Sequence, residues 1–147
     1  MLPEPDKNID LSNTQLYVRA QILRENNELI TDEDHVGLIN LLLHSLFSEV
    51  DITLSGTLVT SSNNTYENRS YLEAILSYGS GAKTSQLTTA LYYKDRAGYL
   101  DDANPYDETP LGNHGFRGRS VLMGEGRVVD MLGCIHSDLF FSRSFSS

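Results

Sequence analysis

The sequence lacks tryptophan, has a single cysteine, Cys134, and contains only three lysines among its 147 residues. One cysteine cannot form an internal disulfide, so no disulfide framework holds the fold together. Such cysteine usage is typical of a reducing compartment. Lysine and arginine total 11 against 20 aspartates and glutamates, which gives a net charge of −9. Because an acidic surface repels phosphate, we do not expect direct binding to DNA or RNA.

A long hydrophobic run is also missing. The longest apolar-rich stretch, residues 36–47, is interrupted by Asn40, His44 and Ser45 and is too short to cross a bilayer. The first residues, MLPEPDKNID, carry prolines and acids where a secretory signal has a basic and then an apolar region. These features predict an intracellular chain that is not secreted and has no membrane partner.

Alternation of apolar and polar residues predicts strands in several places. Residues 15–22 and 50–54 both alternate with a period of two, which is typical of half-buried strands. The Ser55-Gly56 pair predicts a two-residue hairpin that leads into a partner strand at 57–60. A further strand is expected within 128–135.

Helical spacing of apolar residues appears in three segments. Residues 36–47 are apolar around most of a helix axis, which favours a short core helix over an interface helix, with a strand possible at one end. Residues 71–78 form a second pattern, which Gly79 and Gly81 end. Residues 84–93 predict another short helix.

The arrangement of these segments predicts one domain that is mainly β with short helical insertions. Residues 1–13 are polar and proline-containing, and we expect them to form a mobile arm. Residues 95–120 are rich in Gly, Asp, Asn and Pro and predict a long loop, which in a compact domain is usually functional or disordered. Strands, turns and interspersed helices together favour a β-sandwich.

No motif predicts catalysis or metal binding. The four histidines include no pair at the i, i+4 spacing of a metal-binding helix. His136, Ser137 and Asp138 are triad residue types, but neighbours on a strand point to opposite faces. The glycine-rich stretch 112–118 lacks the order of a phosphate-binding loop. Cys134 is expected to be a buried, inert thiol. We therefore predict no enzyme activity, no cofactor and no small-molecule substrate.

Three blocks resemble a known family. NLLLHSLFSEVDITLSGTLVTSSNNTYENRSYLEAILSYG at 40–79, AKTSQLTTALYYKD at 82–95 and VVDMLGCIHSDLFF at 128–141 are similar to the hexon-like major capsid proteins of Maverick (Polinton) transposable elements and adinto-type viruses. The blocks cover about half of the chain, and the two stretches HSLFSEVDITLSG and SNNTYENRSYLEAILSYG are the most specific.

The resemblance implies a double jelly-roll subunit, three copies of which form a capsomer in the virion. In that fold, 50–54 and 58–59 would be early strands of the first jelly roll, with the helices inserted beside it. Whole subunits of the family are several times longer, so we expect residues 14–147 to be an incomplete N-terminal jelly-roll domain. The expected role is structural: self-association as a homotrimer and contact with other capsid subunits.

Within this picture the loop 95–120 is a candidate subunit contact. Its candidate contact residues are Tyr99, Tyr106, Phe116, Arg117 and Arg119. The alternative is a β-sandwich binding module, retained by a host, that takes a protein or carbohydrate partner. A hydrolase that uses His114 or His136 is a third and weaker interpretation, because no nucleophile, base and orienting group can be assembled from the spacing.

Overall fold

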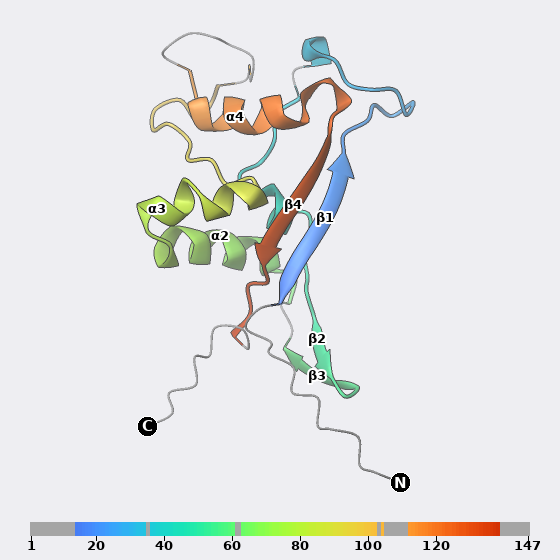
Figure 1. The fold of residues 1–147 in the computed structure, drawn as a ribbon, viewed down its shortest axis with the longest axis vertical. Coiled ribbons are helices and arrows are strands. Elements are labelled where there is room, and N and C mark those ends of the chain that lie inside the picture. Colours follow the sequence, from blue (N-terminus) through green and yellow to red (C-terminus); the bar gives the residue numbers. More distant parts are fainter. Residues whose placement is uncertain (1–13, 35, 61–62, 103, 105–111, 139–147) are drawn as a thin grey trace.

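The computed structural model describes residues 14–34, 36–60, 63–102, 104 and 112–138. These residues form a small mixed α/β structure with two antiparallel sheets and short helices (Figure 1). The elements in chain order are β1 Gln15–Gln21, η2 Asp32–Asp34, α1 Leu42–Ser45, β2 Ile52–Leu54, β3 Thr57–Thr60, α2 Tyr66–Ser77, α3 Ser80–Lys83, η3 Gln86–Ala90, α4 His114–Met123, η4 Gly124–Gly126 and β4 Val128–Cys134, where η marks a 3₁₀ helix.

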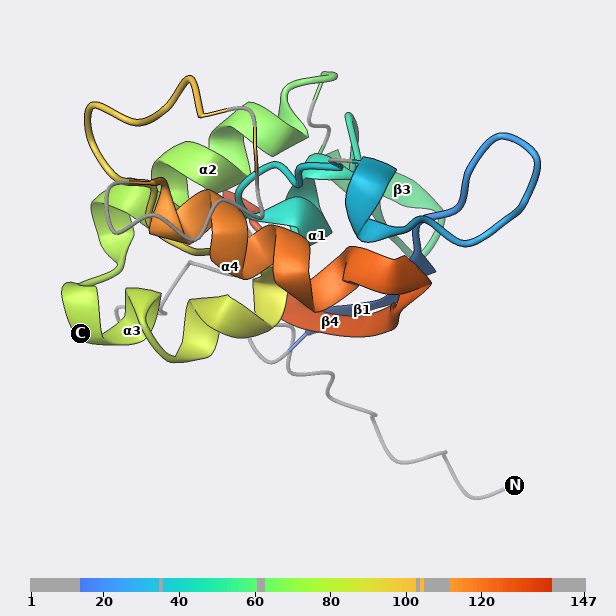
Figure 2. The same ribbon diagram turned by 90° about the horizontal axis from the view of Figure 1, so that it is seen from above.

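The longest sheet is a ribbon of β1 and β4, which join the two ends of the described chain. The strands run antiparallel, and Val18 lies opposite Met131. Both strands expose every second residue, as the period-two pattern of 15–22 predicts. The inner face packs against the hydrophobic core, and Figures 1 and 2 show α2, α3 and α4 gathered beside the ribbon.

The second sheet is the hairpin of β2 and β3, which confirms the prediction for 50–60. Ser55 and Gly56 have φ angles of 50° and 79°, so both central residues of the turn are left-handed. That geometry is the one that matches the twist of a two-residue hairpin. Figure 1 shows the hairpin at the end of the molecule opposite α4.

The core lies between the ribbon and the helices. Leu43 and Met131 are fully buried in it, together with Leu87 and Met123. The helix predicted for 36–47 is much shorter than expected, because α1 contains only Leu42–Ser45. Residues 36–39 have no regular secondary structure, and the chain turns at Leu41, whose amide donates to the carbonyl of Leu91 at 3.0 Å.

Other predictions are corrected in part. Helix 71–78 is confirmed and begins earlier, at Tyr66, whereas 84–93 contains only the 3₁₀ helix η3. The predicted loop 95–120 is wrong for 114–120, which belong to α4. Strands do not predominate among the described residues, so the architecture there is mixed rather than mainly β. The arm 1–13 lies outside the described residues.

None of the helices in the described ranges combines the length and the hydrophobicity that a membrane crossing requires.

Candidate functional site

Helix α2 carries its large apolar side chains on the outside. The residues that it buries are Tyr66, Ser70 and Ala74, two of which are small. Leu72 is 56% exposed and Leu76 is 80% exposed. A helix on the surface of a monomer usually shows the reverse pattern, with its apolar stripe towards the core. A contiguous exposed apolar face of this kind marks a place where another surface binds.

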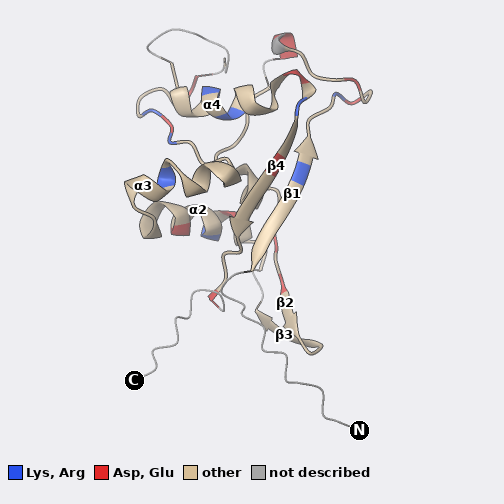
Figure 3. Cartoon of the chain, viewed as in Figure 1, with Lys and Arg blue, Asp and Glu red and all other residues tan. Residues whose placement is uncertain are grey.

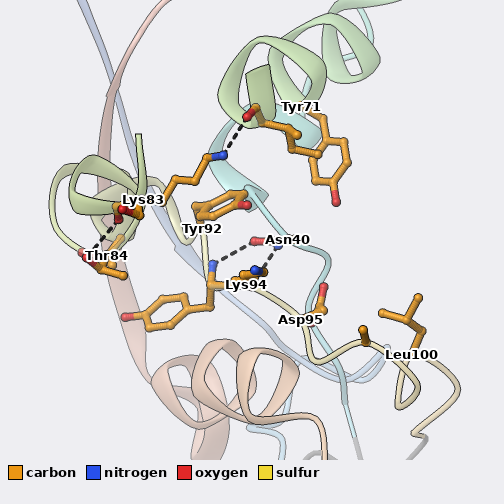
Figure 4. Close-up of a pocket in the computed structure, with 13 residues that line it drawn as sticks. Asn40, Tyr71, Lys83, Thr84, Tyr92, Lys94, Asp95 and Leu100 are labelled. Atoms are coloured by element: carbon orange, nitrogen blue, oxygen red, sulfur yellow. Dashed lines mark hydrogen bonds between the residues drawn. The ribbon is translucent and has the colours of Figure 1, made fainter. Parts of the chain in front are cut away.

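A groove of about 780 Å³ begins at the edge of this face (Figure 4). Tyr71 and Ile75 of α2 line one side, and Leu100 lines the other. Figure 4 shows Tyr92 in the middle of the groove. Burial raises the pKa of the Tyr92 hydroxyl, so this hydroxyl stays neutral. The lining is therefore mostly apolar and aromatic, which suits a side chain or small apolar group of a partner.

Two lysines lie at the same groove. The Lys83 ammonium donates to the backbone carbonyl of Ile75 at 2.6 Å, near the C-terminal end of α2. A cation is favourable at this position because the last carbonyls of a helix carry partial negative charge. Lys94 is exposed at the groove. An apolar groove with basic groups beside it can accept a partner that carries both apolar and acidic groups.

A second hollow of about 480 Å³ adjoins the groove and shares three of its lining residues, Asn40, Tyr71 and Asp95. Its other walls include Ile39, which is exposed, and Phe116 of α4. The two hollows and the outer face of α2 thus form one continuous surface.

Asn40 fixes the floor of this surface. Its amide nitrogen donates to the Tyr93 carbonyl at 2.9 Å, and its amide oxygen accepts from the Tyr93 amide at 2.9 Å. The same oxygen accepts from the amide of Leu41 at 3.0 Å. Asn40 is buried, so each of these polar groups needs a partner, and together they hold segment 91–95 against segment 38–41.

Arg119 connects α4 to the same two segments. Its guanidinium donates to the carbonyls of Leu38 at 3.0 Å and Tyr93 at 2.7 Å. A third nitrogen lies 2.9 Å from a carboxylate oxygen of Asp95. Arg119 is only 3% exposed. Its planar set of donors is therefore used inside the domain, where it holds three chain segments together.

The start of α4 is fixed by Asn113 and Gly115. The Asn113 side-chain oxygen accepts from the amide of Phe116 at 3.3 Å, which caps the helix, and from the amide of Arg96 at 3.1 Å. A β-carbon at position 115 would come within 2.3 Å of the Lys94 carbonyl oxygen. Only glycine therefore allows α4 to approach segment 94–96 this closely.

The predicted contact residues have different environments. The prediction that Arg119 lies in an exposed loop is wrong, because Arg119 is buried on α4. Phe116 and Arg117 are half-buried on the same helix, and the Phe116 ring covers Gly37. Tyr99 does lie in a loop, with the Arg96 guanidinium 4.5 Å from its ring centre. Tyr106 lies outside the described residues. Sequence reasoning missed the α2 face altogether.

The segment His136-Ser137-Asp138 does not form a triad. The His136 ring nitrogen Nδ1 lies 2.8 Å from a Glu73 oxygen, while Asp138 pairs with Arg69 at 2.6 Å. The hydrogen bond from Arg69 lowers the pKa of Asp138, and burial lowers the pKa of His136. The Ser137 hydroxyl oxygen is buried without a hydrogen-bond partner. These side chains join the C-terminal end of the ribbon to α2.

Cys134 was expected to be buried, but it is exposed at the end of β4. The alternation of β4 explains the difference, because Cys134 falls on the same exposed face as Asp130 and Leu132. Within the described ranges, no group of three histidine, cysteine or acidic side chains is arranged to hold a metal ion.

Charged residues are spread over several elements in Figure 3 and are not gathered on one helix or strand. No described element therefore presents the basic stripe that is typical of nucleic-acid binding.

A scan of family models and searches of curated proteins and of solved structures found no match to this chain.

Proposed function

We propose that the chain is a structural capsid protein of the hexon-like class, which assembles with copies of itself as a trimer and with other capsid subunits in a virion. The observation that carries the proposal is the outer face of α2, where Leu72 and Leu76 are exposed. Two of the three residues that the helix buries, Ser70 and Ala74, are small. Transferring a leucine side chain from water into an apolar interface stabilises the interface by about 1.5–3 kcal/mol. A face built in this way gains stability when another subunit covers it.

The strands give independent support. Among the described residues, each sheet has two strands, so every strand has an edge without a pairing partner. The hairpin also exposes Leu54, Leu58 and Val59. Open edges and exposed apolar strands lead to pairing with another chain or aggregation unless they are covered. In an assembly, neighbouring subunits supply that cover.

The fold belongs to the same proposal. We take the β1–β4 ribbon and the β2–β3 hairpin to be parts of a jelly-roll sandwich, with α2 and η3 as insertions beside it. The support is that the segments resembling hexon-like proteins include β2, β3, α2 and η3 as well as all of β4. Further strands paired to the free edges of β1 and β4 are expected in the assembled particle.

Light scattering on a sizing column, over a range of protein concentrations, tests the proposal. We expect a folded species with three times the chain mass of 16.4 kDa, or a larger assembly built from it. Circular dichroism of the same fractions shows whether the species is folded. A folded monomer at all concentrations would contradict the proposal.

A binding module is the second candidate, and one observation favours it. The groove is lined by three tyrosines, Tyr71, Tyr92 and Tyr93, and aromatic rings are common in carbohydrate- and peptide-binding sites. Tyr92 is only 5% exposed, however, so its ring face is not available for stacking. A monomer that shows saturable changes in tyrosine fluorescence with an oligosaccharide or peptide would favour this candidate.

A further inference from the structure

A cavity of about 400 Å³ lies between the end of the β1–β4 ribbon and η3, away from the α2 groove. Its lining includes Gly133 and Cys134 of β4, Leu87 and Ala90 of η3, and His44 of α1. Cavities of this size take small organic molecules in other proteins. The chemistry of the cavity depends on how His44 is protonated.

The proton of the Tyr66 hydroxyl fixes the tautomer of His44. The Tyr66 oxygen has two neighbours: the backbone amide of His136 at 3.4 Å and the Nδ1 atom of His44 at 3.0 Å. The amide is a donor, so it cannot accept the hydroxyl proton. His44 Nδ1 is the remaining acceptor for a hydroxyl that is 1% exposed. When Nδ1 accepts, the proton of a neutral imidazole is on Nε2.

His44 remains neutral under physiological conditions. Burial, together with the nearby His136, lowers the pKa of His44 to about 3. The ring is 1% exposed and lies edge-on to His136, with ring centres 4.6 Å apart. Since both factors oppose a second proton, His44 is a hydrogen-bond donor through Nε2 without carrying charge.

Glycine at position 133 lets the backbone of β4 lie close to the Nε2 atom of His44. A β-carbon at this position would lie 3.1 Å from His44 Nε2 and 2.9 Å from the side chain of Leu43. None of the described interactions of His44 uses Nε2, and His44 lines the cavity, so this N–H group is available to a ligand there. A ligand that accepts a hydrogen bond from this group supplies the partner that the described residues do not.

The lining selects the class of ligand. The lining residues include no lysine, arginine, aspartate or glutamate, while Leu87, Ala90 and Leu132 provide apolar surface. Tyr78 also lines the cavity. We propose that this cavity binds a small neutral molecule with a carbonyl oxygen, which accepts the hydrogen bond from His44 Nε2 while its apolar part packs on η3. This inference concerns a different site from the α2 face and does not depend on capsid assembly.

Cys134 at the edge of the cavity provides a direct test. A fragment with a disulfide exchanges onto its thiolate and releases the other thiol, and β-mercaptoethanol makes the exchange reversible. Two fragments of matched size are compared, one ending in a primary amide and one ending in an isopropyl group. Intact mass spectrometry measures how much of each is retained. We expect about two- to tenfold preference for the amide, the contribution of one hydrogen bond.

Two variants separate the hydrogen bond from general affinity. Gly133→Ala places a methyl group against Nε2 and keeps the histidine, and His44→Phe removes the donor. In both, the preference for the amide is expected to fall to about one. Equal retention in the unmodified chain, or a preference that persists in Gly133→Ala, would overturn the proposal. Long-range ¹H–¹⁵N NMR of the unmodified chain provides a test that needs no variant: a proton on Nδ1 of His44 also overturns it.

Discussion

Helices α2 and α4 use their side chains in opposite ways. α4 buries a charged residue, Arg119, and uses it to hold two other segments of the same chain. α2 buries Ser70 and Ala74 and exposes Leu72 and Leu76. The difference shows that polarity alone does not indicate which side chains of these two helices are buried. The polar side chains of α4 stabilise the domain, and the apolar side chains of α2 are available to a partner.

The largest expected effect of a substitution is at Arg119. Arg119→Met removes the donors to the Leu38 and Tyr93 carbonyls and leaves the Asp95 carboxylate without its cation. Breaking a buried pair from one side costs about 3–5 kcal/mol. We expect urea unfolding to show a decrease of this size in the free energy of unfolding.

The control for this prediction is Arg127→Met, which removes an exposed pair with Glu125. Exposed ion pairs contribute about 0–1 kcal/mol to the free energy of unfolding, so the urea concentration at the midpoint of unfolding is expected to change little. Equal losses in Arg119→Met and Arg127→Met would remove the internal role that we assign to α4.

Acid is expected to destabilise the chain through His44. The folded-state pKa of about 3 lies below the ordinary value of 6.5, so the unfolded chain binds more protons between these values. The contribution of the neutral His44 to the free energy of unfolding is therefore fully present above about pH 6.5, and it is lost as the pH decreases towards 3. One histidine contributes a slope of about 1.4 kcal/mol per pH unit, and about 2–3 kcal/mol is lost between pH 6 and pH 4.

Urea unfolding at several pH values measures this slope. His44→Gln has no titrating group at the position and is expected to give a flatter profile than the unmodified chain, even if its stability at pH 7 is lower. A profile in which the unmodified chain and His44→Gln run parallel from pH 6.5 to pH 4 would contradict the assignment.

Two glycines of α4 form a matched pair. Gly115→Ala places a methyl group against the backbone carbonyl of Lys94, which cannot move without breaking the contact, and we expect a loss of about 1–3 kcal/mol. In Gly118→Ala the new methyl group would lie 3.3 Å from the Tyr93 ring. Alanine has a higher helix propensity than glycine, and this gain of about 1 kcal/mol offsets the cost of the close contact. Thermal unfolding is expected to separate the two variants. A similar change in both would contradict the close approach at Gly115.

The smallest effect on folding is expected on α2. Leu76→Gln changes a side chain that is 80% exposed, so the unfolding free energy of the isolated chain should remain within about 0.5 kcal/mol. The measurement is made at a concentration at which the chain is monomeric. A loss of 2 kcal/mol or more would mean that Leu76 packs inside the domain.

Local patterns were enough to predict part of this fold. The alternation in 15–22, the apolar residues within 128–135 and the Ser55-Gly56 turn predict β1, β4 and the hairpin, because these signals depend on neighbouring residues. The pairing of β1 with β4 was not predicted, since more than a hundred residues separate them. Helix α4 was missed because Gly115 and Gly118 are poor helix formers and its stability comes from tertiary contacts.

The candidate sites were harder to predict. Apolar spacing in 71–78 predicts a helix but does not show that its large side chains face outwards, because that depends on what the core leaves uncovered. Arg119 was expected in an exposed loop, where glycine and polar neighbours placed it. The contacts of Tyr66 with His44 and His136 join residues that lie 22 and 70 positions apart, and no local signal indicates them.

Light scattering on two single variants tests the contrast between the helices most directly. Leu76→Asp charges the outer face of α2, while Val121→Asp charges an exposed position of α4 that is 42% accessible. If the α2 face binds another subunit, Leu76→Asp is expected to be a folded monomer and Val121→Asp to keep the mass of the unmodified assembly. Assembly that survives Leu76→Asp and is lost in Val121→Asp would contradict the account.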